Sequence, residues 1–354
     1  MMLDSPLLAL DVGGGTQDLF LWEPGQAVEN AVKMVLPAPT QIFARRLARL
    51  TAQRQPVFFK GRLMGGGAVT RALRRHLAAG LPVSATPAAA LTFNDDLGTV
   101  KKWGVVLTES APPDAVELVL GDLDPKGWPA LLRPLEIPFP HHFAVAVQDH
   151  GHNPKGSNRT FRFQHWQEFL AQGGRLQDLA YRQPPAYLTR MAAVAEALPR
   201  VLLMDTCAAG VWGALLDPQA RQHREEGLMV VNLGNAHTFA ALVQGERLFG
   251  IYEHHTGLLT PAKLFDHLGR FQAGELTHQE VFDDHGHGCA ITPGYPPGRP
   301  FSFTVVTGPR RRLAQGWPGV FAAPGGDMML TGCFGLADAY LKMAKIPMEI
   351  TDFL

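Results

Sequence analysis

Cysteine is scarce in this chain, and its few thiols are far apart. The 354 residues include three cysteines, Cys207, Cys289 and Cys333, and none of them forms a CxxC pair. Disulfide-stapled secreted scaffolds need more cysteines at closer spacings. The sequence therefore predicts a protein of a reducing compartment, the cytoplasm.

An excess of charge of either sign is also absent. Lys and Arg together number 32, and Asp and Glu together number 32. A general nucleic-acid binder or a protein that binds anionic membranes needs a basic excess, so neither partner is expected. No apolar run reaches the length of a membrane span, and no charged leader precedes an apolar core, so we expect a soluble protein.

Glycine, proline and histidine are plentiful, at 37, 28 and 14 residues. They predict many tight turns and a site rich in imidazole. The length exceeds the size at which single hydrophobic cores stop growing, so two lobes are expected. We place them at residues 1–200 and 201–354, with an irregular proline-rich insertion at 108–142 in the first lobe.

Predicted strands and helices alternate along the chain, which is typical of an α/β fold. Residues 7–10 and 19–22 predict two strands of a hairpin, and residues 227–257 predict a second strand–glycine turn–strand unit. The first turn, DVGGGTQD (11–18), carries two carboxylates beside three glycines. Glycine lets backbone N–H groups approach a phosphate, and a nearby carboxylate can hold magnesium through water. A tight hairpin with polar residues at its bend stays open as an alternative, because a short glycine motif is weak evidence.

Five segments, in order, resemble those of the actin, sugar-kinase and heat-shock-chaperone ATPase superfamily. They match its first phosphate loop, first connecting segment, second phosphate loop, adenosine segment and second connecting helix. The segments are DVGGGTQD (11–18), MDTCAAGVWGALLD (204–217), VVNLGNAHTFAAL (230–242), VVTGPRRRL (305–313) and PGGDMMLTGCFGLADAYL (324–341). The resemblance implies a two-lobed actin-like ATPase (ribonuclease-H-like) fold that holds ATP and Mg²⁺ in a cleft between the lobes.

More narrowly, the chain resembles the family catalogued as domain of unknown function 1786. The segments that carry this resemblance include LPAPT (36–40), AVQDHG (146–151), SNRTFRF (157–163), EHHTG (253–257) and GDMMLTGCFGL (326–336). Some members carry a name that links them to pyruvate formate-lyase activation. That name implies an iron–sulfur cluster held by three closely spaced cysteines. The chain has no such triplet, so we set the name aside.

The superfamily resemblance assigns roles to individual residues. Asp11 would orient magnesium-bound water, and Asp205 would orient water or act as a general base. Asn232 stands where the second phosphate loop usually has Asp, and an amide can neither neutralise a metal nor accept a proton. The residues expected to contact phosphate or nucleoside are Gly13, Gly14, Gly15, Thr16, Gln17, Asn232, Gly234, Asn235, His237 and Gly308.

Acid–histidine clusters follow three predicted strands, at the strand ends where sites gather in α/β folds. We hypothesise a transition metal held by His150, His254, His255 and His287, with Asp149 as a candidate catalytic group, because imidazole and carboxylate bind zinc, iron and manganese. The alternative is that these histidines form hydrogen bonds in loops or lie on the surface. HH and HxH pairs lack the i, i+4 helical spacing of a sharp metal motif.

The segment SNRTFRF (157–163) offers a site for an anionic small-molecule substrate. Asn158, Arg159 and Arg162 are its candidate residues, because guanidinium makes paired hydrogen bonds to carboxylate or phosphate. The alternative is a solvated loop beside a strand, with the phenylalanines facing the core.

The leading functional hypothesis is nucleotide-dependent phosphoryl transfer, or ATP hydrolysis, acting on a small molecule. A metal-dependent enzyme on the same fold is one rival. A non-catalytic nucleotide sensor or assembly protein is another, and Asn232 favours it. Analogy at the level of the fold does not choose among them, and the sequence does not indicate an oligomeric state.

Overall fold

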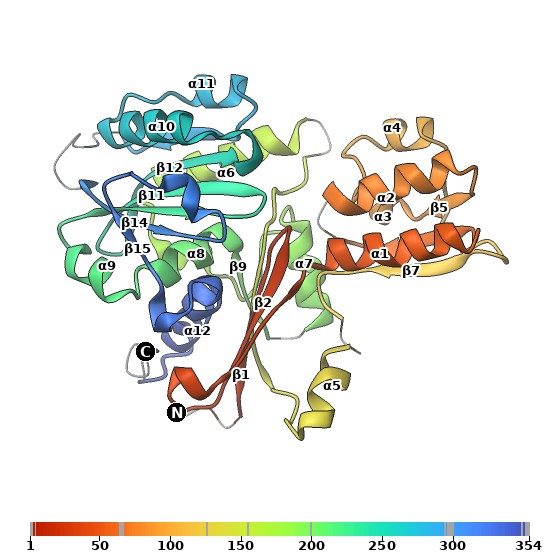
Figure 1. The fold of residues 1–354 in the computed structure, drawn as a ribbon, viewed down its shortest axis with the longest axis horizontal. Coiled ribbons are helices and arrows are strands. Elements are labelled where there is room, and N and C mark those ends of the chain that lie inside the picture. Colours follow the sequence, from red (N-terminus) through yellow and green to blue (C-terminus); the bar gives the residue numbers. More distant parts are fainter. Residues whose placement is uncertain are drawn as a thin grey trace.

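Three β-sheets organise the molecule in the computed structural model (Figure 1). The structure describes residues 3, 5–63, 67–124, 127–153, 156–198, 200–293, 295, 301–347 and 350. Among the described helices, none has both the length and the hydrophobicity to cross a bilayer.

The first sheet lies at the centre of the molecule and has the strand order β3-β2-β1-β8-β9. Strands β1, β2 and β3 pair antiparallel in succession, while β8 runs parallel to β1 and β9 parallel to β8. Their bounds are β1 Leu7–Val12, β2 Thr16–Trp22, β3 Val32–Pro37, β8 His142–Val147 and β9 Leu202–Asp205.

The second sheet repeats this arrangement with one added strand, in the order β13-β12-β11-β10-β14-β15. Here β10, β11 and β12 pair antiparallel, and β14 and β15 continue parallel to β10. Their bounds are β10 Leu228–Leu233, β11 His237–Gln244, β12 Arg247–His255, β13 Gly288–Ile291, β14 Phe303–Thr307 and β15 Val320–Phe321. Two copies of three antiparallel strands followed by two parallel strands make the predicted two-lobed, ribonuclease-H-like fold, which is confirmed.

An additional α/β unit is inserted between β3 and β8 and lies to one side of the first sheet, in orange in Figure 1. Its parallel sheet has the order β6-β5-β4-β7 and its own buried core. The predicted insertion at 108–142 therefore begins too late, because the inserted unit already starts at α1. The elements are α1 Pro39–Ala52, β4 Val57–Gly61, α2 Gly67–Ala78, β5 Val83–Ala85, α3 Pro87–Ala90, α4 Leu97–Lys102, β6 Val105–Leu107 and β7 Val116–Leu120, followed by α5 Gly127–Leu132.

The predicted lobe boundary near residue 200 cuts through the first sheet. Strand β9 follows that boundary, yet it pairs with β8. Conversely, α6 (Asn158–Ala171) precedes the boundary and packs on β12 and β13 of the second sheet. After α7 (Thr189–Ala197) the chain returns to the first sheet at β9.

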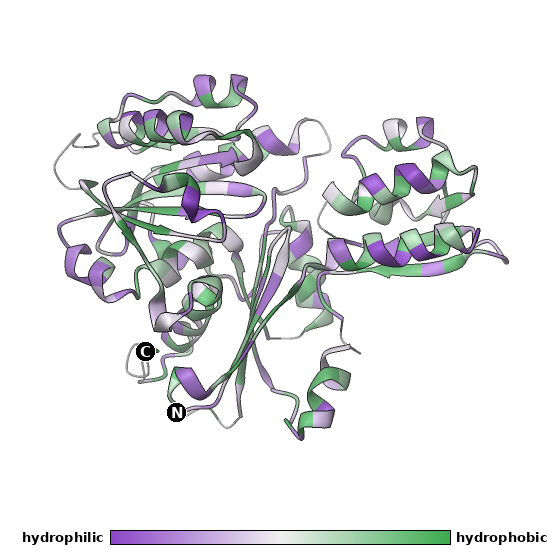
Figure 2. Cartoon of the chain, in the orientation of Figure 1, coloured by the Kyte–Doolittle hydropathy of each residue, from purple (hydrophilic) through white to green (hydrophobic). Residues whose placement is uncertain are grey.

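Peripheral helices α9 (Pro218–His223), α10 (Pro261–Ala273) and α11 (His278–Asp283) lie around the second sheet. Figure 2 shows that α9 and α11 are largely hydrophilic, as expected for helices at the edge of the molecule. A capping box starts α11, in which Thr277 and Glu280 bond each other's backbone N–H.

Two glycine-containing helices, α8 (Thr206–Ala214) and α12 (Thr331–Met343), cross between the sheets. Each follows the last strand of one sheet and packs on the first strand of the other, α8 on β10 and α12 on β1. At the crossing their backbones touch: a Cβ atom added to Gly213 would lie 1.7 Å from the carbonyl oxygen of Thr331. Only glycine fits there.

We therefore expect Gly213→Ala to destabilise the protein by about 1–3 kcal/mol, because the added methyl group overpacks the crossing. Gly257→Ala is the matched control, since nothing lies within 4 Å of a Cβ atom there, and it should change stability by less than about 0.5 kcal/mol. Urea unfolding of both variants measures the difference. Equal stabilities would contradict the close crossing of α8 and α12.

Candidate functional site

The turns that follow β1 and β10 have the same local geometry. The N–H of Gly13 donates to the carbonyl oxygen of Thr16 at 2.9 Å, and the N–H of Gly234 donates to that of His237 at 2.9 Å. The tips of the two turns touch, because a Cβ atom on Gly15 would lie 2.7 Å from the side-chain nitrogen of Asn235. The structure thus brings the two predicted phosphate loops, Gly14 included, together at one place between the sheets.

A pair of buried carboxylates lies beside the first turn. Asp11 on β1 and Asp18 on β2 are direct cross-strand partners, so their side chains share one face of the sheet. One oxygen of each, Oδ1, is buried and has no hydrogen-bond partner in the described part of the chain. Burial, and then the charges of Asp18 and Asp205, raises the pKa of Asp11 well above its ordinary value.

Asp18 is a site residue that the sequence prediction missed. Burial raises its pKa to about 7, the hydroxyl of Thr16 opposes the shift, and the charge of Asp327 adds to it. Two facing carboxylates with unsatisfied oxygens fit a divalent cation, since like charges opposite one another otherwise destabilise a sheet. The signal in the sequence was the hairpin itself, because a turn centred between Gly14 and Gly15 places residue 18 opposite residue 11.

The position equivalent to Asp11 in the second sheet is Asn232. A Cβ atom on Gly332 of α12 would lie 2.0 Å from Asp11 Oδ2, and one on Gly210 of α8 would lie 2.4 Å from Asn232 Nδ2. Each of these side chains therefore packs against a glycine of the helix that crosses from the other half. The predicted nucleoside residue Gly308 is buried with a φ of +97°, and a Cβ atom on it would lie 2.4 Å from the carbonyl oxygen of Leu233.

Asp205 and Asp149 have their carboxylate oxygens engaged. Asp205 accepts from the guanidinium of Arg162 and from the N–H groups of Cys207 and Asp149. Asp149 accepts from the N–H groups of Gly151 and Met191 at 2.9 and 3.0 Å. Asp205 thus lies between the two sheets and Asp149 against the start of α7, and the catalytic roles predicted for them stay predictions.

The predicted loop at SNRTFRF is the start of helix α6, and its three candidate residues diverge. The side-chain oxygen of Asn158 accepts a hydrogen bond from the N–H of Asn153 in the preceding loop at 2.9 Å. Arg159 lies 3.8 Å over the ring of Phe282. Arg162 is 2% exposed and points into the protein. They do not form the substrate site that we predicted.

Arg162 is instead the centre of a buried ion-pair network. Its Nε donates to Glu253 at 2.7 Å, and one terminal nitrogen donates to Asp205 at 2.8 Å and to the carbonyl oxygen of Asp149 at 2.8 Å. Burial would raise the pKa of Glu253, but Arg162 and nearby histidines hold it well below its ordinary value. The network joins β9 of the first sheet to β12 of the second.

Three histidines from different strands meet beside this network. His150 follows β8, His237 begins β11, and His287 precedes β13; one ring nitrogen of each lies within 4.8 Å of the others. The Nε2 atoms of His150 and His287 are 3.0 Å apart. The ring of His255 lies 4.8 Å from the rings of His237 and His287. Burial lowers the pKa of His150 and His237, and it lowers that of His287 to about 4, so the imidazoles are neutral at pH 7.

This grouping differs from the predicted metal set at three residues, His254, His237 and His255, of which His255 lies at its border. His254 bonds Asp284 at 3.0 Å and points away from the cluster, because neighbouring residues on a strand face opposite sides. His237, which we assigned to phosphate, belongs to the cluster. It is the cross-strand partner of His255, and the sequence shows no such pairing before the register is known.

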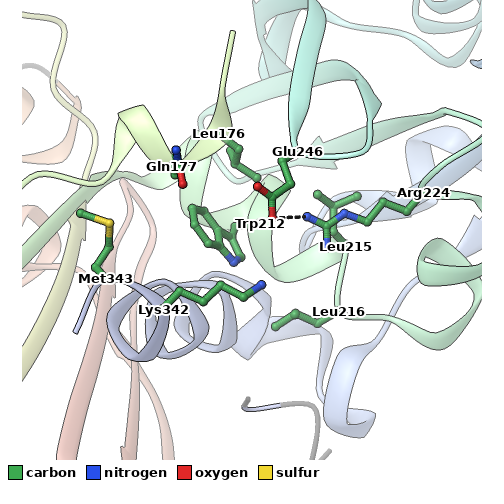
Figure 3. A pocket seen from close by; sticks show the side chains of 9 residues that line it. All are labelled: Leu176, Gln177, Trp212, Leu215, Leu216, Arg224, Glu246, Lys342 and Met343. Atoms are coloured by element: carbon green, nitrogen blue, oxygen red, sulfur yellow. Dashed lines mark ion pairs between the residues drawn. The ribbon is translucent and has the colours of Figure 1, made fainter. Parts of the chain in front are cut away.

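Besides a hollow of about 450 Å³ against α1 and α2 of the inserted unit, two cavities lie elsewhere. A groove of about 660 Å³ between the inserted unit and the first sheet is lined by Gln17, Phe43 and Trp128, among others. The predicted phosphate residue Gln17 donates to the carbonyl oxygen of Pro37 at 2.9 Å, on the opposite face of the sheet from Asp11. A smaller pocket of about 70 Å³ between α8, α12 and the β11–β12 turn is shown in Figure 3, where Arg224 pairs with Glu246 at 3.6 Å. Neither cavity contains a histidine of the cluster.

A family model with the description "Putative pyruvate format-lyase activating enzyme (DUF1786)" matches residues 64–313 of the sequence. The chain belongs to this family. No curated protein matches the sequence.

The cysteines of this chain do not fit the iron–sulfur chemistry that the family's description implies. Cys207, Cys289 and Cys333 lie on α8, β13 and α12, and all three are buried. Burial raises the pKa of each thiol, to about 12 for Cys289. Cluster ligands are thiolates held close together, so these cysteines are structural.

Two solved structures are similar in outline. The ROK hexokinase of Thermus thermophilus is 13% identical, with 96% of this chain and 99% of that one covered and a TM-score of 0.32. A protein titled a putative sugar kinase, from Cytophaga hutchinsonii, is 9% identical, with 69% and 49% covered and a TM-score of 0.23. The assignment of the fold rests on the strand order of the two sheets.

Proposed function

We propose that this protein binds a magnesium nucleotide between the two hairpin turns and transfers a phosphoryl group from it to a small-molecule acceptor in the cytoplasm. The observation that carries the proposal is the facing pair Asp11 and Asp18, whose unsatisfied oxygens lie beside the first glycine turn. Magnesium prefers such carboxylates and keeps most of its waters, which bridge to phosphate.

The residues of the site would act through position and charge. Asp11 and Asp18 would hold the cation, which would neutralise charge on the phosphates. The backbone N–H groups of the turns at Gly14 and Asn235 would hold the phosphates from the two sheets. Because Gly15 already touches Asn235, the two turns must separate for the nucleotide to enter.

A second candidate, nucleotide binding without turnover, is favoured by the engaged carboxylates of Asp205 and Asp149. Neither side chain is available as a base in this arrangement. The amide of Asn232 adds no acid or base from the second turn. Formation of ADP from Mg-ATP by the purified protein, alone and with candidate small-molecule acceptors, separates the two candidates.

The proposal is tested by calorimetric titration with ATP, in magnesium and in EDTA. We expect magnesium-dependent binding that Asp11→Asn weakens by at least about 10-fold, since the change removes a charge that holds the cation. The variant should melt no lower than the wild type, because it also removes repulsion between Asp11 and Asp18. Asp114→Asn, at an exposed position of the inserted unit, is the control. An Asp11→Asn protein that binds Mg-ATP normally would exclude this site.

A further inference from the structure

We propose that His150, His237 and His287 form a binding site for a divalent transition-metal ion. The site is separate from the carboxylate pair Asp11 and Asp18, and the proposal goes beyond nucleotide binding. The three ring nitrogens lie within 4.8 Å of one another, and two of them are 3.0 Å apart. Nitrogens that bind one zinc ion at about 2.0–2.1 Å with tetrahedral angles are separated by roughly 3.4 Å, so small rotations of the rings complete the geometry.

His150 and His287 already bring two potential ligand atoms together. Nε2 of each ring faces Nε2 of the other at 3.0 Å, and without an ion one of the two must carry the proton that they share. His287 is only 2% exposed, and its Nδ1 atom has no hydrogen-bond partner among the described residues. No contact at Nδ1 therefore fixes which nitrogen of this ring carries the proton. A metal ion would use both facing nitrogens as lone-pair donors.

Side chains behind the cluster provide the support that metal-binding histidines usually have. The amide of Gln148 bonds Nδ1 of His237, and a carboxylate oxygen of Glu253 lies 4.0 Å from the same atom. Glu253 is itself fixed by Arg162 and by the indole N–H of Trp166. If the Gln148 amide turns so that its oxygen accepts from Nδ1–H, Nε2 of His237 is left free for the ion, which is the support that outer groups give metal-binding histidines.

The ligand set defines the class of ion. Three neutral imidazoles suit zinc, iron(II) or cobalt(II), whereas magnesium and calcium prefer oxygen ligands. Three protein ligands leave a fourth position for water or for a substrate oxygen, as in catalytic zinc sites. His255 lies at the border of the cluster, with its ring 4.8 Å from those of His237 and His287.

The site would also join the two halves of the molecule. His150 comes from the end of β8 in the first sheet, while His237 and His287 adjoin β11 and β13 of the second. An ion bound by all three stabilises the arrangement in which the sheets approach each other, because it binds only when they are together. Metal binding should therefore raise the melting temperature.

The test is cobalt(II) binding to the metal-free, untagged protein, without nucleotide. We expect one ion per chain and the intense visible absorption of four-coordinate cobalt. His150→Gln and His237→Gln should each weaken binding by more than about 100-fold, since even outer-shell changes cost 10–100-fold. His223→Gln, whose ring stacks on Phe303 far from the cluster, should bind like the wild type.

A measurement on the wild type alone guards against variants that fail to fold. X-ray absorption of the zinc complex should show scattering from three imidazole rings and no sulfur. Absence of stoichiometric cobalt binding at micromolar concentrations would overturn the proposal. So would a zinc shell made of oxygen or sulfur, or unchanged cobalt affinity in folded His150→Gln and His237→Gln.

Discussion

Replacement of Arg162 by methionine is expected to lower the free energy of unfolding by about 3–5 kcal/mol, because it leaves buried carboxylates without their cation. Asp205 and Glu253 are 5% and 0% exposed, and both bond the guanidinium. Methionine fills similar space but donates no hydrogen bond. Urea unfolding at pH 7 measures the loss.

Two comparisons isolate the cause. Arg175→Met removes a cation from an exposed pair with Asp178 and should cost no more than about 1 kcal/mol. Adding Glu253→Gln and Asp205→Asn to Arg162→Met should recover part of the stability, because the unpaired charges are then gone. If Arg162→Met were as stable as the wild type, the buried network would not be what holds α6 to both sheets.

Asp18→Asn is expected to stabilise the metal-free protein, by an amount that grows with pH. The pKa of Asp18 is raised from 3.8 to about 7 in the folded state. The folded protein therefore binds more protons than the unfolded chain between these values, and the stability that Asp18 contributes below pH 3.8 is lost as pH rises to 7. Asparagine does not ionise and loses no stability in this range. The difference in unfolding free energy between Asp18→Asn and the wild type should therefore grow by up to about 4 kcal/mol from pH 4 to pH 8.

The relevant quantity is the difference in unfolding free energy between variant and wild type at each pH. Buried histidines and Glu253 have lowered pKa values, so they make the unfolding free energy rise with pH. This contribution is the same in variant and wild type, and it cancels in the difference. Asp114→Asn, at an exposed position, should give a flat difference. Millimolar magnesium should reduce the gain if the cation binds at the pair. A flat difference for Asp18→Asn would show that its carboxylate is ionised at low cost.

Local pattern was enough to predict the two hairpins and the α/β class, because apolar alternation around a glycine turn is encoded within a dozen residues. The site depended on strand register, which the alternation of apolar residues does not define by itself. Asp18 faces Asp11, and His237 faces His255, only once the strands are paired. The start of helix α6 was predicted as a loop because its first turn is polar. Its buried side chains pack on β12 and β13, which are far away in the sequence, so the local pattern does not reveal them.

The path of α6 restricts how the two halves of this molecule can separate. Arg162, on that helix, holds β9 of one sheet and β12 of the other through buried bonds, while the glycine turns lie against each other at Gly15 and Asn235. Separating the turns breaks the contact between Gly15 and Asn235. Separating the sheets at Arg162 would leave a buried charge without its partner. The halves should therefore rotate about an axis near Arg162, so that the two turns move farther apart than the residues around Arg162.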